Sequence, residues 1–203
     1  TIGEWAAKFH EQSRTWTKPY GFTRFNWDLS NMVGPAPRWG RWENADLSDE
    51  ERHLCDTALW KAMDVVMKVP RTTETWGLIH ADLRPSNVIR GDDGKLTIID
   101  FDDAGYSWYL YDYASSLSFI EHEPYAPDLA KAWVKGYQSV AGAFTDEQLH
   151  IMSALSMIRR LQMLGWTTSH REDALPDGLA AQQAPGSVMC AKRYLDDPLW
   201  LLH

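Results

Sequence analysis

Residues 80–103, HADLRPSNVIRGDDGKLTIIDFDD, combine two short apolar runs with a cluster of acidic and amide side chains. The β-branched runs at 88–90 and 96–99 flank a Gly-Asp-Asp-Gly turn, a pattern typical of a β-hairpin. Because the strands of a hairpin are antiparallel, residues before the first strand lie beside residues after the second. The sequence therefore predicts that Asn87 and Asp100 are neighbours in space.

The polar side chains at this end of the hairpin suit one kind of chemistry. Four carboxylates gather there, on Asp82, Asp100, Asp102 and Asp103. They repel one another unless a cation lies among them, and Mg²⁺ prefers oxygen ligands such as carboxylates, an amide oxygen and phosphates. Asp82, five residues before Asn87, can accept a proton from a hydroxyl, and Arg84 is a fixed cation suited to a phosphate oxygen. A base, metal ligands and a cation together indicate phosphoryl transfer.

The segments HADLRPSN and IIDFDD resemble the catalytic and metal-binding loops of the aminoglycoside phosphotransferase and choline kinase family, which has a protein-kinase-like fold. The resemblance implies that Asp82 is the catalytic base and that Asn87 and Asp100 bind Mg²⁺ and, through it, ATP. LYDYA at 110–114 resembles the start of the helix after the metal loop, where Asp112 would support the catalytic loop. AKFHEQS at 7–13 resembles the helix that follows the hinge between the lobes. His80 is expected to orient the catalytic loop through a hydrogen bond to the backbone.

Two residues depart from the family pattern. Ala81 replaces the usual glycine, and Arg84 replaces the usual histidine. Arg84 occupies the place of a lysine in protein kinases, which favours a contact with the γ-phosphate. A conventional protein kinase is nevertheless disfavoured, because Asp102 follows Phe101 where such kinases have glycine. The short stretch from there to Tyr111 also leaves no room for an activation loop.

The chain is expected to form one mainly helical α+β domain over residues 1–203, the C-terminal lobe of this fold with a small hairpin at its catalytic site. Capping boxes at Thr1, Ser48 and Thr145 predict three helix starts. The remaining expectations are, in chain order, a helix ended by Pro70, a strand at 77–79, an aromatic loop at 104–111, a helix capped by Asp112 and ending near 120, a helix from Pro127, a helix end at Gly165, a loop at 167–186 and a last short helix through 195.

The chain contains no glycine-rich phosphate loop. The resemblance therefore implies that the N-terminal β-lobe, which holds the other half of the ATP site, precedes Thr1 and is missing here. The isolated lobe is expected to be catalytically inactive and prone to self-association through the surface that met the missing lobe.

The composition limits the classes of partner. A net charge of −8 argues against a nucleic-acid groove or an anionic membrane surface. The two cysteines, Cys55 and Cys190, have no metal-ligand spacing and indicate a reducing cytoplasm. No apolar run approaches the ~18 residues of a membrane span.

Eleven tryptophans are many for 203 residues. Most are expected to fill the core, but the irregular segment 18–45 is long enough to suggest a functional loop. Trp27, Trp39 and Trp42 in this segment, together with Asp102, are the candidates for the acceptor side of the site. Aromatic faces and carboxylates would suit an acceptor that carries an amine.

Three functions fit these observations. The leading hypothesis is a small-molecule kinase that moves the γ-phosphoryl group of ATP to a hydroxyl. A metal-dependent phosphate hydrolase would share the acidic cluster without needing the Asp-x-x-x-x-Asn spacing joined to the hairpin. A non-catalytic kinase-like binding module is the third alternative.

Overall fold

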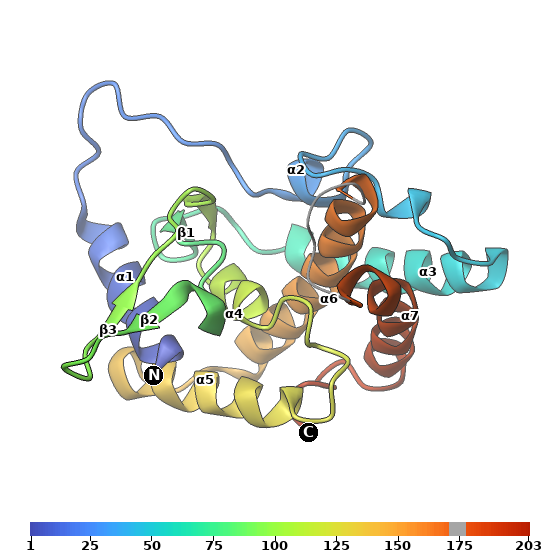
Figure 1. The fold of residues 1–203 in the computed structure, drawn as a ribbon. Coiled ribbons are helices and arrows are strands. Elements are labelled where there is room, and N and C mark those ends of the chain that lie inside the picture. Colours follow the sequence, from blue (N-terminus) through green and yellow to red (C-terminus); the bar gives the residue numbers. More distant parts are fainter. Residues whose placement is uncertain (171–177) are drawn as a thin grey trace.

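Figure 1 shows a computed structural model of the chain, which describes residues 1–170 and 178–203. Its elements are α1 (Ile2–Thr15), α2 (Leu29–Val33), a 3₁₀ turn η1 (Trp42–Asn44), α3 (Asp49–Met67), β1 (Trp76–Ile79), a 3₁₀ turn η2 (Pro85–Asn87), β2 (Val88–Arg90), β3 (Leu96–Ile98), β4 (Gly105–Trp108), α4 (Tyr111–Ser116), α5 (Ala126–Ala141), α6 (Asp146–Ser169) and α7 (Leu179–Asp196).

The three predicted capping boxes are all present. The side chains of Thr1, Ser48 and Thr145 each accept a hydrogen bond from the backbone three residues later, at the starts of α1, α3 and α6. In each case the Glu or Gln at that third position bonds back to the capping residue's backbone. The sequence thus predicted these helix starts correctly because their signals are local.

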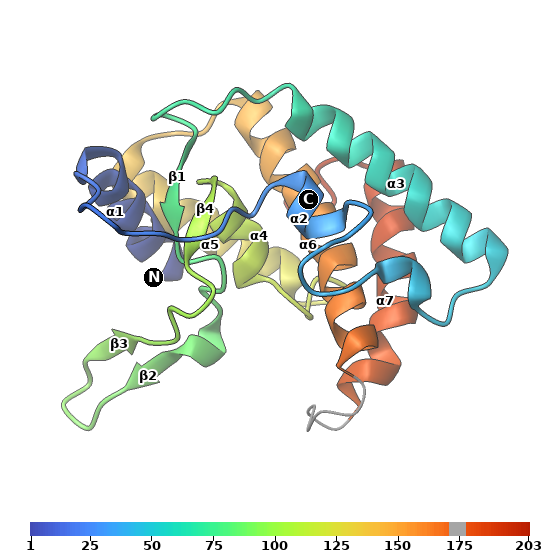
Figure 2. The same cartoon turned by 90° about the horizontal axis from the view of Figure 1, so that it is seen from above.

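Two small antiparallel sheets position the candidate site. The predicted hairpin is confirmed as β2 and β3, with Val88 opposite Ile98, and it projects from the body of the molecule (Figure 2). The second sheet pairs β1 with β4, with Trp76 opposite Trp108. The prediction of an aromatic loop at 104–111 was wrong for its first half, which is strand β4. Glycine and serine there have low strand propensity, and the strand forms because it pairs with the distant β1.

The helices form two groups. On one side α1 packs against α5, where a Cβ added to Gly3 would overlap the carbonyl oxygen of Trp133. On the other side α3, α6 and α7 lie against one another (Figure 2). Residues 151–165 of α6 are all buried, so this helix is the centre of the core.

The predicted end of α6 at Gly165 was wrong, because the helix continues to Ser169. Gly165 instead allows a close approach, since a Cβ there would overlap the carbonyl oxygen of Gly40 and lie 3.0 Å from the Trp42 nitrogen. The glycine is therefore needed for packing and does not end the helix.

Other predicted helix boundaries also differ from those in the structure. α7 begins at Leu179 and contains Pro185, whereas a loop was expected through residue 186, and residues 171–177 of that loop lie outside the described part of the chain. α3 ends at Met67 rather than at Pro70. The residue that precedes α4 is Leu110, so Asp112 lies within the helix and does not cap it, and the helix ends at Ser116.

Within residues 1–170 and 178–203, no helix is both long enough and apolar enough to cross a bilayer.

The contact between Gly165 and Gly40 predicts that Gly165→Ala changes stability in the direction opposite to that of an ordinary helix glycine. Replacing an ordinary mid-helix glycine by alanine stabilises a helix by roughly 0.5–1 kcal/mol. Gly165→Ala should instead destabilise the protein by about 1–3 kcal/mol, because its methyl group overlaps the Gly40 backbone. Urea denaturation of both proteins measures the difference, and a gain in stability would contradict the packing argument.

Candidate active site

The segment between β1 and β2 carries Asp82 and Asn87, which are both buried. The amide nitrogen of Asn87 donates hydrogen bonds to the backbone oxygen and to the carboxylate Oδ2 of Asp82, both at 2.8 Å. The amide nitrogen is therefore committed to Asp82, and the amide oxygen of Asn87 is the atom left for a cation.

Two arginines hold the carboxylate of Asp82. Arg84 donates from Nε to both oxygens, at 3.0 and 3.1 Å, and its side chain is 28% exposed. Arg159, from the middle of α6, donates from Nη2 to Oδ1 at 3.0 Å and is completely buried. Asp82 thus accepts from one cation on the solvent side and from one cation inside the core.

Asp112 and His80 hold residues 80–87, the candidate catalytic loop, in place through hydrogen bonds. The buried carboxylate of Asp112 accepts hydrogen bonds from the backbone nitrogens of Ala81 (2.7 Å) and His80 (3.3 Å) and contacts Nε2 of His10 at 2.9 Å. The His80 ring receives the backbone N–H of Asp82 on Nδ1, so its Nε2 is the donor to the backbone oxygen of Ile99 at 3.2 Å. His80 therefore joins the catalytic loop to the end of β3.

Three non-glycine residues at or near the site have left-handed backbone. Ala81 has φ 64°, Asp100 has φ 65° and Phe119 has φ 74°. This conformation explains why a glycine is usual at the position of Ala81, since only glycine adopts it without steric cost. Strain of this kind gathers at functional sites, where the surrounding contacts enforce it.

The base of the hairpin carries the two predicted metal ligands, Asn87 and Asp100. The backbone nitrogen of Ile99 donates to the backbone oxygen of Asn87 at 3.0 Å, which places Asp100 one residue beyond that pair. The prediction that Asn87 and Asp100 are neighbours is thus consistent with the register. Asp100 is exposed. Among the described residues, no three His, Cys, Asp or Glu side chains form a metal site by themselves.

The acidic residues after Asp100 differ in their surroundings. Arg24 donates to the backbone oxygens of Phe101, Asp102 and Ala104, and the Trp27 indole donates to that of Asp103 at 2.8 Å. The side chain of Asp102 is exposed, whereas that of Asp103 is partly buried. Burial raises the pKa of the Asp103 carboxyl, against the opposing effect of Arg159.

The structure corrects the predicted aromatic wall. Trp27 and Trp42 are 0% and 3% exposed and belong to the core, so neither can present a face to a substrate. Trp39 is partly exposed, packs on Trp27 with ring centroids 4.5 Å apart, and lies 5.1 Å from the Arg159 guanidinium. Of the three tryptophans, Trp39 alone remains a candidate for contact with a substrate.

A packed pair of aromatic rings lies beside Arg84. Phe119 lies 5.3 Å from the Arg84 guanidinium and packs against Trp166, with ring centroids 5.7 Å apart. Both rings are partly exposed. An open apolar groove beside Arg84 is lined by Phe119, Tyr125 and Leu179.

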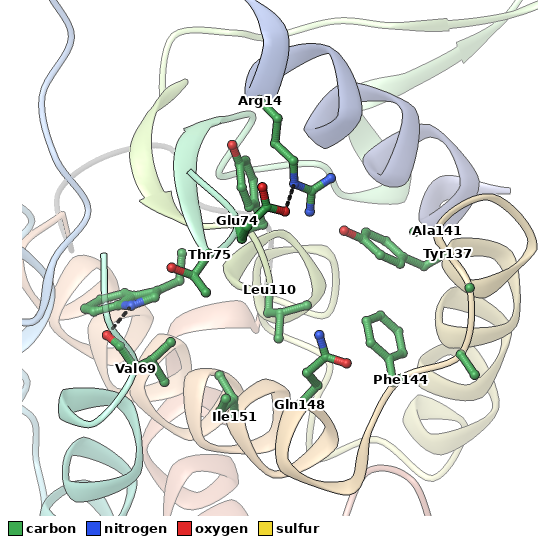
Figure 3. Close-up of a pocket in the computed structure, with 14 residues that line it drawn as sticks. Arg14, Val69, Glu74, Thr75, Leu110, Tyr137, Ala141, Phe144, Gln148 and Ile151 are labelled. Carbon is green, nitrogen blue, oxygen red and sulfur yellow. Dashed lines mark hydrogen bonds and ion pairs between the residues drawn. The ribbon is translucent and has the colours of Figure 1, made fainter. Parts of the chain in front are cut away.

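A separate pocket lies between α1, α5 and α6 (Figure 3). Arg14, Glu74, Tyr137 and Phe144 are among the residues that line it. None of the candidate catalytic or metal-binding residues borders this pocket, so it is distinct from the site described above.

Comparisons with known proteins show the family to which the chain belongs. A model of the phosphotransferase enzyme family matches residues 1–149. The chain belongs to this family. Among curated phosphotransferases, amicoumacin kinase from Bacillus subtilis (strain 168) is 29% identical over 142 residues, a match that covers 68% of this chain and 39% of that protein.

Solved structures of small-molecule kinases show the same fold. A microcompartment-associated aminopropanol kinase matches with a TM-score of 0.86 and 33% identity over 100% of this chain and 63% of that one. A choline kinase from Streptococcus pneumoniae matches with a TM-score of 0.59 and 13% identity over 95% and 63%. An amicoumacin kinase in complex with AMP-PNP, Ca²⁺ and Ami matches at 0.65 and 18% over 94% and 57%. The predicted fold, a mainly helical α+β lobe of the protein-kinase-like phosphotransferases, is confirmed, and the chain spans 39–63% of these relatives.

Three residues at or near the candidate site were not found from the sequence. Arg159 and Trp166 lie in an apolar helical pattern far along the chain from Asp82, and Arg24 lies in an irregular segment. A buried arginine in such a helix is itself a signal, because a charge is rarely buried without a partner. That signal does not say which carboxylate the partner is.

The left-handed backbone at Ala81 predicts that Ala81→Gly has only a small effect on the free energy of unfolding. In a helix interior, Ala→Gly costs about 1 kcal/mol in propensity alone. Ala81→Gly should change the free energy of unfolding by less than about 1 kcal/mol, because relief of backbone strain offsets the lost methyl group. Ala58→Gly, at an equally buried position within α3, is the matched control. Equal losses in both variants would contradict the strain at Ala81.

Proposed function

We propose that the full-length protein is an ATP-dependent kinase that phosphorylates the hydroxyl group of a small amino alcohol. The observation that supports this proposal is the hydrogen bond of Asn87 to Asp82 at one end of a hairpin whose register puts Asp100 one residue beyond the partner of Asn87. All of this chain also matches an aminopropanol kinase, over 63% of that kinase. The name of that relative supports an acceptor that bears both an amine and a hydroxyl group.

Asp82 is the proposed base. Its carboxylate is held at both oxygens and is only 9% exposed, so it has a fixed direction. An acceptor hydroxyl that donates to this carboxylate becomes oriented for attack on the γ-phosphorus, and Asp82 takes its proton as the new P–O bond forms.

Arg84 is the proposed γ-phosphate contact. In the free protein its Nε spans both oxygens of Asp82, and its side chain is partly open to solvent. A phosphate competes well for such a guanidinium. Movement of Arg84 from Asp82 to the phosphate would free lone pairs on the carboxylate for the acceptor hydroxyl.

Asn87 and Asp100 are the proposed Mg²⁺ ligands, and through the metal they would hold ATP. The donor set fits a hard cation, because Asn87 leaves its amide oxygen available and Asp100 presents an exposed carboxylate. When bound, the metal would neutralise charge on the phosphates. Two protein ligands suffice, since Mg²⁺ fills its remaining positions with phosphate oxygens and water.

The proposed acceptor side is formed by partly exposed aromatic rings and one carboxylate. Trp39 lies against Arg159, Phe119 lies against Arg84, and Trp166 packs on Phe119. These rings can cover the carbon skeleton of a small alcohol. Asp103 is the proposed partner of the acceptor's amine, because no described donor bonds its side chain. Asp102 is a weaker candidate, since it faces solvent.

Asp82→Asn tests the proposed function directly. The full-length variant should lose roughly 10²–10⁴-fold in kcat, because asparagine cannot take the proton, while its Kd for Mg–ATP stays nearly unchanged. ADP release with aminopropanol as acceptor measures the rate, and calorimetry measures nucleotide binding. Asp92→Asn, in the exposed hairpin turn, is the matched control. A kcat for Asp82→Asn within about tenfold of the wild type would exclude the base role.

Asp103→Asn tests the amine contact. It should raise the KM for an amino alcohol without changing that for ATP, whereas Asp102→Asn should change neither. Because burial raises the pKa of Asp103, its charge destabilises the fold at pH 7, and this cost disappears as the carboxyl is protonated at lower pH. The variant should therefore be at least as stable as the wild type at pH 7, an advantage that vanishes by about pH 3.5. An unchanged KM would refute the amine contact.

A further inference from the structure

Two adjacent arginines, Arg159 and Arg160, lie in the middle of α6 and are both completely buried. Arg160 pairs with Glu121 at 2.7 Å and also bonds Ser187 and the backbone of Gln183, which joins α6 to α7 and to the segment after α4. Arg159 points to the catalytic loop instead. The two arginines therefore have the same charge, helix and burial, but they contact different parts of the protein.

Every nitrogen of the Arg159 guanidinium has a partner. Nε donates to the Ser118 hydroxyl at 2.8 Å, Nη1 to the Tyr111 hydroxyl at 2.8 Å, and Nη2 to Oδ1 of Asp82 at 3.0 Å. Three contacts in different directions leave a planar guanidinium no alternative orientation. Its contact with Asp82 is therefore fixed by the core.

The protons of this network have one consistent assignment. Tyr111 accepts from Arg159 and donates its own hydrogen to Oε1 of Gln162, while Ser118 accepts from Arg159 and donates to the backbone oxygen of Ser115. Burial raises the pKa of Tyr111 to about 12, so its hydroxyl stays a donor at neutral pH. Tyr111 and Ser118 each accept once and donate once, which fixes both hydroxyl groups around the Arg159 guanidinium, whereas the amide nitrogen of Gln162 has no partner among the described residues.

Arg84 and Arg159 hold Asp82 in different ways. Arg84 is partly exposed and contacts both oxygens from the side where a phosphate would arrive. When Arg84 turns to a phosphate, Asp82 keeps only Asn87 on Oδ2 and Arg159 on Oδ1. The orientation of the carboxylate at the moment of reaction then depends on the buried arginine.

We infer that Arg159 is the positioning residue for the Asp82 carboxylate, an inference that rests on the proposed kinase function. Arg159 does not touch a substrate. It holds Oδ1 from inside the core, so that the other lone pairs of Asp82 face the acceptor hydroxyl. A displacement of about 1 Å at a reacting group can cost on the order of 10² in rate, which sets the size of the expected effect.

The adjacent arginine makes a matched pair of variants possible. In the full-length protein, Arg159→Met should lower kcat roughly 10²-fold with little change in the KM for ATP. Arg160→Met loses an equally buried charge and should lower thermal stability while leaving kcat close to that of the wild type. Arg159→Lys, which keeps the charge, should recover part of the lost rate. Equal losses of kcat in Arg159→Met and Arg160→Met would overturn the inference.

A double-mutant cycle separates positioning from a general structural role. If Arg159 acts through Asp82, Arg159→Met should cost almost nothing further in an Asp82→Asn background. A full additional loss there would overturn the inference.

A readout without turnover keeps the inference separate from the proposed function. In crystal structures of the two variants, the Asp82 carboxylate should be rotated or displaced in Arg159→Met, because the buried donor to Oδ1 has been removed. It should keep its wild-type orientation in Arg160→Met, because Arg160 pairs with Glu121 instead. An unmoved carboxylate in Arg159→Met overturns the inference even if no acceptor is phosphorylated, whereas an inactive wild type with a displaced carboxylate in Arg159→Met contradicts the proposed function alone.

Discussion

A completely buried carboxylate is stable only when hydrogen-bond donors surround it. The arrangement of the site depends on the donors that contact the buried carboxylate of Asp112. Its oxygens contact the backbone of His80 and Ala81 and the ring of His10, which brings α4, the catalytic loop and α1 to one point. The other ring nitrogen of His10 lies 3.0 Å from the Tyr137 hydroxyl, which adds α5. Because a buried charge without partners costs several kcal/mol, these four elements cannot separate cheaply. The left-handed backbone at Ala81 is one local cost of presenting its N–H to this carboxylate.

Because buried polar groups need partners within the protein and exposed ones do not, the site has a fixed side and an open side. Towards the core, Arg159, Asn87 and Asp112 are buried and hydrogen-bonded within the protein. Towards solvent, Arg84 and Asp100 keep exposed polar groups that a nucleotide and a metal could use. Catalysis by positioning needs this division, because groups that are held in place before substrate binds cost no reorganisation during the reaction.

The sequence predicted what local rules determine and missed what distant contacts determine. The hairpin, the three capping boxes and the family were legible because turn residues, cap residues and the Asp-x-x-x-x-Asn spacing lie close together in the chain. β4 was missed because it is a strand only when paired with β1. Gly165 was misassigned because the reason for a glycine there is the backbone of Gly40. The position of Trp27 in the core and the direction of Arg159 likewise depend on segments about 80 residues away.

Large apolar side chains are exposed on both faces of the hairpin and just beyond it. Ile89 lies opposite Thr97 and Leu96 lies opposite Arg90, so Ile89 and Leu96 point to opposite faces. Ile89, Leu96, Ile99 and Phe101 are 53%, 51%, 36% and 43% exposed, close in the chain to Asn87 and Asp100. Burial of such apolar area would favour association of the lobe with another surface. The net charge of −8 opposes association between two copies, because like charges repel at low ionic strength. Added salt screens that repulsion without weakening the apolar attraction, so pairing of two lobes through the hairpin would strengthen with ionic strength. A partner that contributes positive charge would instead bind more weakly as salt rises. The salt dependence of association therefore distinguishes a second copy of the chain from a basic surface as the partner of the hairpin.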